Sequence, residues 1–279
     1  MKRVQGNNLK INVAVWKGRG KTVLCIHGIT ANCRSWDLIA QSLVPEYEVM
    51  AIDLRGRGLS DKPNNGYSVD HHIKDIVCLL DDQSIDKVIL MGHSLGAFVS
   101  LAFAARHPER VEKLIIVDGA GELSTEQMDH VFSAIKPALD RLSKTFASIE
   151  EYLEEMKSAP YIHPWSQVLE NYYRYEIEEV AGGVRTNINP KHILEESENV
   201  RKIDPPALYN KIACKTLILN ATQGLVSQDD LLLPEDTVGK MIREIPHARQ
   251  FAVMGVNHYG IVLQPHKDRD DAIRAFLGK

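Results

Sequence analysis

The five residues Gly92-His93-Ser94-Leu95-Gly96 stand between an apolar run, Val88–Met91, and an apolar pattern of helical period. A strand can turn sharply into a helix only where the residues two before and two after the turn are very small. Such a turn lifts the serine hydroxyl clear of the sheet, beside backbone N–H groups that favour a developing negative charge. The pattern therefore predicts that Ser94 is a nucleophile for acyl transfer.

A second turn, His27-Gly28-Ile29, follows the apolar run Thr22–Ile26. Gly28 allows the backbone to turn away from the sheet and to aim an N–H group at a pocket. A tetrahedral oxyanion needs two donors, and we predict that these are the N–H groups of Ile29 and Leu95. We also expect His27 and Gly28 to border the substrate.

A serine nucleophile needs a base, and the chain contains 11 histidines. His258 alone follows a late strand pattern and lies in a loop, Gly255–Gly260, ahead of the last helical pattern. From such a loop an imidazole can accept the serine proton and return it to the leaving group. We therefore predict that His258 is the general base. His93 lies within the turn itself, and its side chain leaves the strand in another direction.

The rest of the chain alternates short apolar runs with amphipathic segments. Runs that are apolar at every position are typical of strands covered on both faces, as in a parallel sheet. We predict strands at Thr22–Ile26, Val49–Ile52, Val88–Met91, Leu114–Val117, Thr216–Leu219 and Phe251–Met254. We predict helices at Ser35–Leu43, Val69–Asp82, Leu95–His107 and Lys267–Leu277. This rhythm indicates an α/β fold, and the first 16 residues favour an antiparallel hairpin at one sheet edge.

The rhythm stops between the runs Leu114–Val117 and Thr216–Leu219. Residues 121–208 show helical patterns and no strand pattern, so we expect a helical cap inserted into a core of residues 1–120 and 209–279. We predict cap helices at Thr125–Phe146, Ile149–Lys157 and Gln167–Val180. Because the segment is rich in aromatic residues, it suits a lid over an apolar pocket. We expect Trp165 to contact the substrate and the lid to move more than the sheet.

These motifs together resemble the α/β-hydrolase superfamily. The matching stations are His27-Gly28, Asp53-Leu54-Arg55-Gly56-Arg57-Gly58-Leu59-Ser60, the serine turn, His107-Pro108-Glu109-Arg110-Val111 and Asn257-His258-Tyr259. The resemblance implies a mostly parallel eight-stranded sheet with helices on both faces and an inserted helical cap. It also implies a serine carboxylesterase-like enzyme, although this fold carries many chemistries.

The resemblance implies a third residue, a carboxylate that orients the histidine, and here several candidates compete. Most members of the superfamily place it after the seventh strand, where the present chain has Gly224. Counting backward from Pro234 reaches Asp230, whose neighbour is Asp229. Some branches of the superfamily instead use an acid at the end of the preceding strand, which here is Asp118. We favour Asp118 over Asp230, with Asp229 and Glu122 as further alternatives.

The leading functional hypothesis is hydrolysis of small or medium, largely apolar carboxylic esters through a Ser94 acyl-enzyme. The alternatives are a C–C bond or lactone hydrolase, a cofactor-free oxygenase, and a ligand receptor without turnover. Neither a metal-binding motif nor a nucleotide-binding glycine loop occurs, so we expect no metal and no cofactor.

Composition limits the partners of the protein. The 279 residues include 33 Lys+Arg and 37 Asp+Glu, a net charge of −4, which disfavours nucleic acid and anionic membranes as partners. The chain has no apolar run long enough to span a membrane and no signal-peptide pattern. Four cysteines without a CxxC pair indicate reduced thiols. We expect a cytoplasmic monomer or homodimer that acts on a small-molecule ester.

Overall fold

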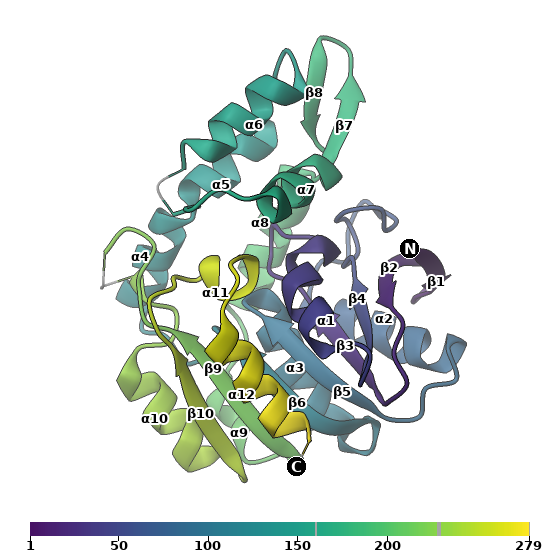
Figure 1. Ribbon diagram of the computed structural model, residues 1–279, viewed down its shortest axis with the longest axis vertical. Helices are drawn as coiled ribbons and strands as arrows, with labels where there is room; N and C mark the ends of the chain where they lie inside the picture. The colour runs from purple at the N-terminus through teal and green to yellow at the C-terminus, as the bar shows by residue number, and fades with distance from the viewer. Residues whose placement is uncertain (160, 228–229, 279) are drawn as a thin grey trace.

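The computed structural model describes residues 1–159, 161–227 and 230–278, and its centre is one eight-stranded sheet (Figure 1). The strands are β1 (Lys2–Gln5), β2 (Lys10–Trp16), β3 (Thr22–Ile26), β4 (Glu48–Ile52), β5 (Val88–His93), β6 (Val111–Val117), β9 (Lys215–Ala221) and β10 (Ala248–Val253). Their order across the sheet is β1-β2-β4-β3-β5-β6-β9-β10. β2 is antiparallel to both of its neighbours, and the remaining pairs are parallel. The predicted mostly parallel eight-stranded sheet is confirmed.

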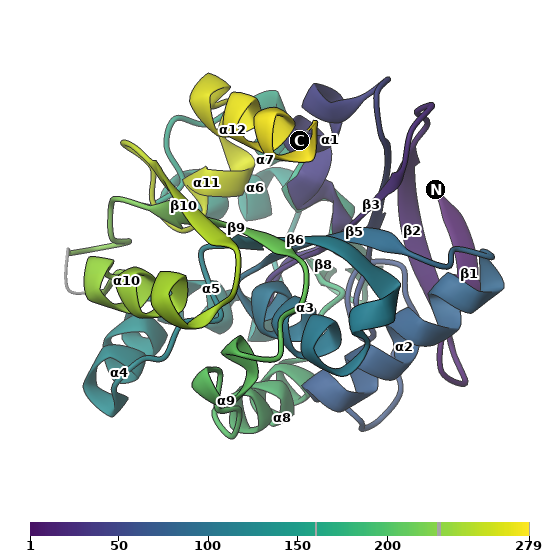
Figure 2. The same ribbon diagram turned by 90° about the horizontal axis from the view of Figure 1, so that it is seen from below.

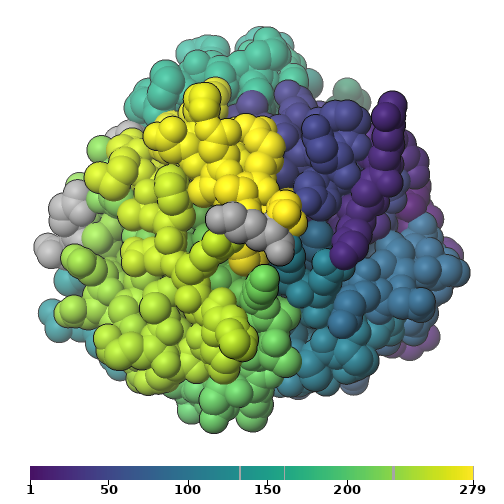
Figure 3. Space-filling model, turned by 60° about the horizontal axis from the view of Figure 1, so that its bottom comes forward, coloured from purple at the N-terminus to yellow at the C-terminus, as the bar shows by residue number. Residues whose placement is uncertain are grey.

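Helices cover both faces of this sheet (Figure 2). On one face lie α1 (Asp37–Leu43), α11 (Gly260–Leu263) and α12 (Lys267–Leu277), and on the other lie α2 (Val69–Asp82), α3 (Leu95–Arg106), α9 (Pro206–Tyr209) and α10 (Glu235–Glu244). Two short 3₁₀ helices, η1 (Cys33–Trp36) and η2 (Pro108–Arg110), precede α1 and β6. Figure 3 shows the C-terminal helix beside the N-terminal third of the chain, which agrees with the contact of α12 with α1.

The uniform hydrophobicity of the central strands follows from this two-sided burial. Successive side chains of a strand point to opposite faces. In β3, Val23 and Cys25 belong to the apolar cluster under α1 and α12, whereas Leu24 and Ile26 belong to the cluster under α2 and α3. All four side chains are fully buried. Each position of the strand must therefore be apolar.

The chain leaves the sheet after β6 and returns to it at β9. The segment between them contains α4 (Thr125–Ala134), α5 (Lys136–Asp140), the 3₁₀ helix η3 (Arg141–Ser143), α6 (Ile149–Lys157), α7 (Gln167–Tyr175), β7 (Ile177–Val180), β8 (Gly183–Thr186) and α8 (Pro190–Val200). In Figure 1, α5, α6, α7 and the hairpin lie above the carboxyl ends of the strands, while α8 descends toward the core. We propose residues 121–208 as a cap domain on this basis.

The cap differs from its predicted form in two places. The expected helix Gln167–Val180 ends at Tyr175, and β7 and β8 form an antiparallel hairpin, so the expectation of an all-helical cap was wrong. Gly182 and Gly183 have φ values of 91° and 138°, a conformation that other residues rarely adopt, and they close the turn. The expected helix Thr125–Phe146 is broken after Ala134, close to Pro137, whose ring cannot continue a helix from the preceding turn.

Where local signals are strong, predicted and observed bounds agree. The helices Val69–Asp82, Ile149–Lys157 and Lys267–Leu277 begin and end as predicted. Across the described ranges, no helix combines the length and hydrophobicity needed to cross a membrane.

Candidate active site

The turn at Ser94 has the strained geometry that the sequence pattern requires. Ser94 adopts φ 55° and ψ −119°, a conformation unfavourable for a residue with a side chain. A Cβ on Gly92 would lie 2.1 Å from the carbonyl oxygen of Gly96, and a Cβ on Gly96 would lie 2.0 Å from that of Ile26. Both positions therefore exclude any larger residue. The surrounding backbone holds Ser94 in place, since its N–H donates to the carbonyl of Val117 at 3.1 Å.

The turn after β3 passes directly beside Ser94. A Cβ built on Gly28 would lie 3.2 Å from Ser94 Cβ and 3.6 Å from Ser94 Oγ. The N–H of Ala31 donates to the carbonyl of Gly28 at 3.1 Å and closes this turn around Ile29. Leu95 occupies the first position of α3, where a helix offers no acceptor for the backbone N–H. Ile29 and Leu95 thus flank the serine on two sides.

His27, which we expected to border the substrate, does not line the cavity at Ser94. Its side chain is fully buried, and its Nε2 accepts the N–H of Leu54 at 3.0 Å. Its Nδ1 lies 2.7 Å from the carbonyl oxygen of Gly28, so this nitrogen carries the proton. Burial lowers the pKa of His27 to about 4, and the ring stays neutral. The residue supports the turn, whereas Gly28 itself lines the cavity at Ser94.

His258 and Asp118 meet at the carboxyl ends of β6 and β10. His258 Nδ1 lies 2.7 Å from Asp118 Oδ2, and both side chains are buried. The other carboxylate oxygen, Asp118 Oδ1, accepts the N–H of Ala221 in β9 at 3.0 Å. A backbone φ of 45° turns Asp118 away from the sheet toward the histidine. This arrangement leaves Nε2 as the ring nitrogen available to Ser94.

Ser94 and His258 line the same cavity. Among the described side chains, the hydrogen bond of the His258 ring is the one to Asp118. A serine–histidine hydrogen bond often tightens only when substrate is bound. Ser94 and His258 therefore belong to one site, and we expect their hydrogen bond to form when a substrate is bound.

The rival carboxylates are engaged elsewhere. Asp230 accepts the N–H groups of Leu225, Val226 and Ser227 and so closes its own loop. Glu122 forms an exposed ion pair with Lys240. Asp229 lies outside the described residues. Of the described candidates, the structure brings Asp118 to His258 and leaves Asp230 and Glu122 away from it.

His93 supports the backbone of His258, a contact that sequence reasoning missed. His93 Nε2 lies 2.9 Å from the carbonyl oxygen of His258, and the two ring centroids are 4.4 Å apart. Because a carbonyl can only accept, Nε2 carries the proton. Burial, together with the nearby His258, holds the pKa of His93 well below its usual range, so the ring stays neutral. The one feature of the sequence that could have indicated this role of His93 is its position next to Ser94.

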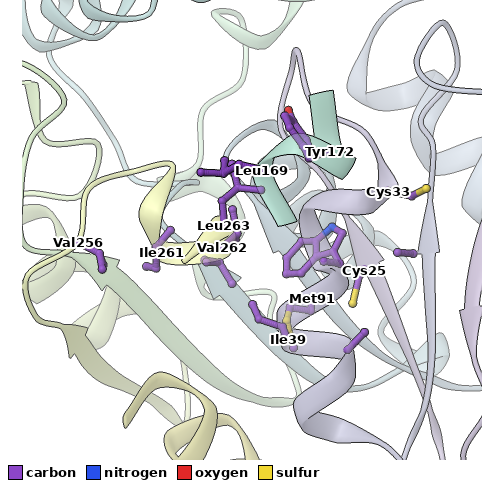
Figure 4. Packing of buried hydrophobic residues seen from close by; sticks show 14 of the residues in the cluster. Cys25, Cys33, Ile39, Met91, Leu169, Tyr172, Val256, Ile261, Val262 and Leu263 are labelled. Atoms are coloured by element: carbon purple, nitrogen blue, oxygen red, sulfur yellow. The ribbon is translucent and has the colours of Figure 1, made fainter. Parts of the chain in front are cut away.

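A mainly apolar cavity lies beside Ser94. We call it the Ser94 cavity. Its wall combines Gly28, Ile29 and His258 of the core with Ile135, Leu139 and Tyr172 of the cap. Val262 and Leu263 of α11 complete it, and Figure 4 shows them on the side of α7 that carries Leu169 and Tyr172.

Trp165 does not reach this wall. Its ring stacks on that of Tyr173, with centroids 5.7 Å apart, and it lines neither the Ser94 cavity nor the cavity next to it. The aromatic residues that line the Ser94 cavity are instead Tyr172 and Tyr259. In the part of the chain that the structure describes, no three His, Cys, Asp or Glu side chains gather as a metal site would require.

Comparisons with known proteins agree with this architecture. A family model for the alpha/beta hydrolase fold matches residues 21–265. A 2-(acetamidomethylene)succinate hydrolase of Mesorhizobium japonicum is 27% identical over 258 residues, which cover 92% of this chain and 88% of the relative. A 3-hydroxybutyrate-oligomer hydrolase of Cupriavidus necator is 26% identical over 253 residues, covering 88% and 85%.

Solved structures extend the likeness to the complete fold. The crystal structure of an E-2-(acetamidomethylene)succinate hydrolase superposes with a TM-score of 0.87 at 26% identity, over 100% of this chain and 98% of that one. The protein belongs to the α/β-hydrolase family and is a hydrolase of that fold.

Proposed function

We propose that this α/β-fold hydrolase cleaves carboxylic esters of small or medium, largely apolar substrates through a Ser94 acyl-enzyme. The observation that carries the proposal is the convergence of three features on one cavity. A strained serine, a turn with backbone donors and a carboxylate-bound histidine all border the Ser94 cavity or lie directly behind it. The largely apolar wall suits an acyl chain.

In the proposed reaction, Ser94 Oγ attacks the ester carbonyl while His258 Nε2 accepts its proton. The N–H groups of Ile29 and Leu95 stabilise the oxyanion of the tetrahedral intermediate. His258 returns the proton to the leaving alcohol, and a water activated by the same histidine then releases the acid. Asp118 holds the tautomer that directs Nε2 toward Ser94 and stabilises the charged imidazole.

Labelling and turnover test the nucleophile. Ser94→Ala should abolish p-nitrophenyl butyrate hydrolysis and fluorophosphonate labelling, while the thermal melt stays near that of the wild type. Ser35 lines the same cavity and donates to the carbonyl of Asn32, so Ser35→Ala is the matched control and should keep both activities. Labelling that persists in Ser94→Ala, or that disappears in Ser35→Ala alone, rejects the assignment.

A pair of isosteric variants tests the acid. Asp118→Asn should lower kcat by about 10⁴-fold, because an amide cannot hold the reacting tautomer. Asp230→Asn should disturb the loop at Leu225 and leave kcat within about threefold of the wild type, since Asp230 bonds only its own loop in the described residues. The opposite pattern would assign the acid to Asp230.

A substrate panel separates the proposal from the alternatives on this scaffold. It should include lactones, C–C bond substrates and 2-(acetamidomethylene)succinate, for which the relative is named. Oxygen consumption would identify a cofactor-free oxygenase. Tight ligand binding without turnover or labelling would identify a receptor.

A further inference from the structure

A second cavity adjoins the Ser94 cavity and extends it into the cap. The two cavities share the lining residues Thr30, Ala138, Tyr172 and Tyr259. Its wall includes Arg141, so we call it the Arg141 cavity. Among the described residues that line the two cavities, Arg141 is the only lysine or arginine. A long acyl chain bound at Ser94 would extend toward it.

The donors of Arg141 are already occupied. Its Nε and Nη2 donate to the carboxylate of Glu176, with distances of 3.1, 2.9 and 3.1 Å. Its Nη1 donates to the carbonyl of Ala138, and its Nη2 also lies 3.4 Å from the carbonyl oxygen of Thr30. Both side chains of the ion pair are almost completely buried, at 5% and 0% exposure. The guanidinium charge is therefore matched by a carboxylate of the protein itself.

Glu176 is held in this position by a second group. The hydroxyl of Tyr152 donates to Glu176 Oε1, and Tyr152 is fully buried. The ring of Tyr173 lies under the guanidinium, with 5.9 Å between Arg141 Cζ and the ring centroid. Opening the pair to admit another carboxylate would leave Glu176 buried and uncompensated, which is strongly unfavourable. Arg141 is thus not available as an anion-binding group.

A carboxylate on the acyl chain would meet repulsion in the Arg141 cavity. Beyond the occupied Arg141, the wall carries Glu155, whose partner is Lys144 on the outer surface. An uncharged chain would instead meet aromatic rings and the side chain of Met156. Burying a charge without a partner costs far more than burying an apolar group.

On the basis of the proposed function, we propose that the site selects acyl chains without a charge, and that Glu176 enforces this selection by occupying Arg141. Specificity then rests on an unfavourable interaction with the wrong substrate as well as on contacts with the right one. Glu176 acts through Arg141 and does not touch the reacting atoms.

Matched esters test the selection in the wild-type protein. p-Nitrophenyl butyrate and mono-p-nitrophenyl succinate differ only by a terminal carboxylate in place of a methyl group, and five- and six-carbon pairs extend the series toward Arg141. We expect kcat/KM for the neutral member to exceed that for the charged member by about 100-fold in at least one pair. Equal values in every pair, or a preference for the charged esters, would overturn the proposal.

The variant Glu176→Gln tests the role of the carboxylate. It keeps the shape of the side chain but frees the charge of Arg141, so the ratio of charged to neutral kcat/KM should rise by about 10-fold or more. Glu155→Gln is the comparison variant: it removes the repulsion of a half-exposed carboxylate from the same wall without freeing Arg141, so its rise in the ratio should be clearly smaller. An unchanged ratio in folded Glu176→Gln, or an equal rise in Glu155→Gln, contradicts the assignment.

Two further measurements keep the test decisive. If Glu176→Gln does not fold, the double variant Arg141→Gln/Glu176→Gln takes its place, because it leaves no unpaired charge. It should retain the wild-type preference for neutral esters. Loss of that preference would reject the role of the pair. Calorimetric binding of the same esters to Ser94→Ala reports charge selection without turnover. If no ester is hydrolysed, the proposed function fails, but the binding measurement still tests the charge selection. Tighter binding of the charged ester would then refute that selection.

Discussion

The front and back halves of the cap lie over the same core but are attached to it differently. The front half, residues 124–143, contributes Ile135, Ala138 and Leu139 to the Ser94 cavity. The helix α4 in this half has a largely exposed surface. The buried Arg141, which begins η3 at the end of the front half, lies 3.4 Å through its Nη2 from the carbonyl oxygen of Thr30 in the core. The front half therefore lies over the Ser94 cavity with little polar attachment to the core, while Arg141 ties its end to Glu176 of the back half.

The back half, residues 167–200, is attached through buried polar groups. Glu196 of α8 binds Arg57 at 2.5 Å and His72 at 2.8 Å, and all three side chains are almost fully buried. Tyr175 of α7 donates to Asp53 at 2.6 Å. Such contacts tolerate little displacement, because separating them leaves buried charges unpaired. The difference indicates that the back half is held more firmly to the core, and we expect substrate access to depend on the front half.

One back-half contact also reaches the turn His27-Gly28-Ile29 beside Ser94. Arg57 donates from Nε to the carbonyl of Ile29 at 3.1 Å while its Nη2 binds Glu196. The attachment of the cap and the shape of the turn beside Ser94 thus share one guanidinium.

The largest expected effect comes from removing the back-half attachment. Glu196→Ala should lower the free energy of unfolding by about 3–5 kcal/mol, because it leaves Arg57 buried without its partner. The control in the front half is Asp140→Ala, which breaks an exposed pair with Lys136 and should cost about 1 kcal/mol or less. Urea unfolding of both variants measures the contrast. Similar losses in the two variants would remove the distinction between the halves.

Acid should weaken the same attachment in a defined range. Burial favours a higher pKa for Glu196, but His72 and Arg57 outweigh it and lower the pKa to about 2, against 4.5 for an ordinary glutamate. Above pH 4.5 the stabilisation is complete. Below it the unfolded chain takes up a proton that the folded protein does not, so stability is lost as the pH falls toward 2.

The difference in unfolding free energy between wild type and Glu196→Gln measures this linkage. It should be constant from pH 6 to pH 5 and should then shrink by about 1.4 kcal/mol for each pH unit below 4.5. A difference that stays constant down to pH 3.5 would show that the ionised form of Glu196 contributes nothing to the attachment.

Hydrogen exchange compares the halves without any substitution. Amides of α4 should exchange at least about 10-fold faster than those of α7 and α8, because α4 lies ahead of the buried Arg141–Glu176 pair and a segment without a buried ion pair opens locally at lower free energy. The strand β5 provides the slow reference. Equal protection in the two halves would mean that the cap moves, or stays closed, as one body.

The smallest expected effect is a change in substrate length. Leu139→Ala should raise kcat/KM for longer esters relative to p-nitrophenyl butyrate by about 3- to 10-fold, since it enlarges the Ser94 cavity from the front half. Leu194→Ala, in the back half, removes a side chain that is 62% exposed and should leave the ratio unchanged. An equal change in the length ratio in both variants would show that the effect does not come from the wall of the Ser94 cavity.

Much of the fold was predictable because its signals are local. Ser148 caps the start of α6, and His266 and Gly278 mark the two ends of α12, while two-sided burial makes the central strands apolar throughout. The cap was less predictable. Gly182 and Gly183 permit a turn, but the hairpin also depends on Phe146, which pairs with Val184 and lies far away in the sequence.

The sequence by itself determined the turn at Ser94, because only glycine fits at positions 92 and 96, and it predicted His258 as the base by its place before the last helix. Tertiary structure decided which carboxylate meets that histidine. Asp118 and Asp230 both follow apolar strands, but the positive φ of Asp118 and the N–H of Ala221 in the neighbouring strand aim only Asp118 at His258. Likewise, Arg141 and Glu176 stand 35 residues apart. Their pairing depends on how the cap folds back on itself, which no local pattern records.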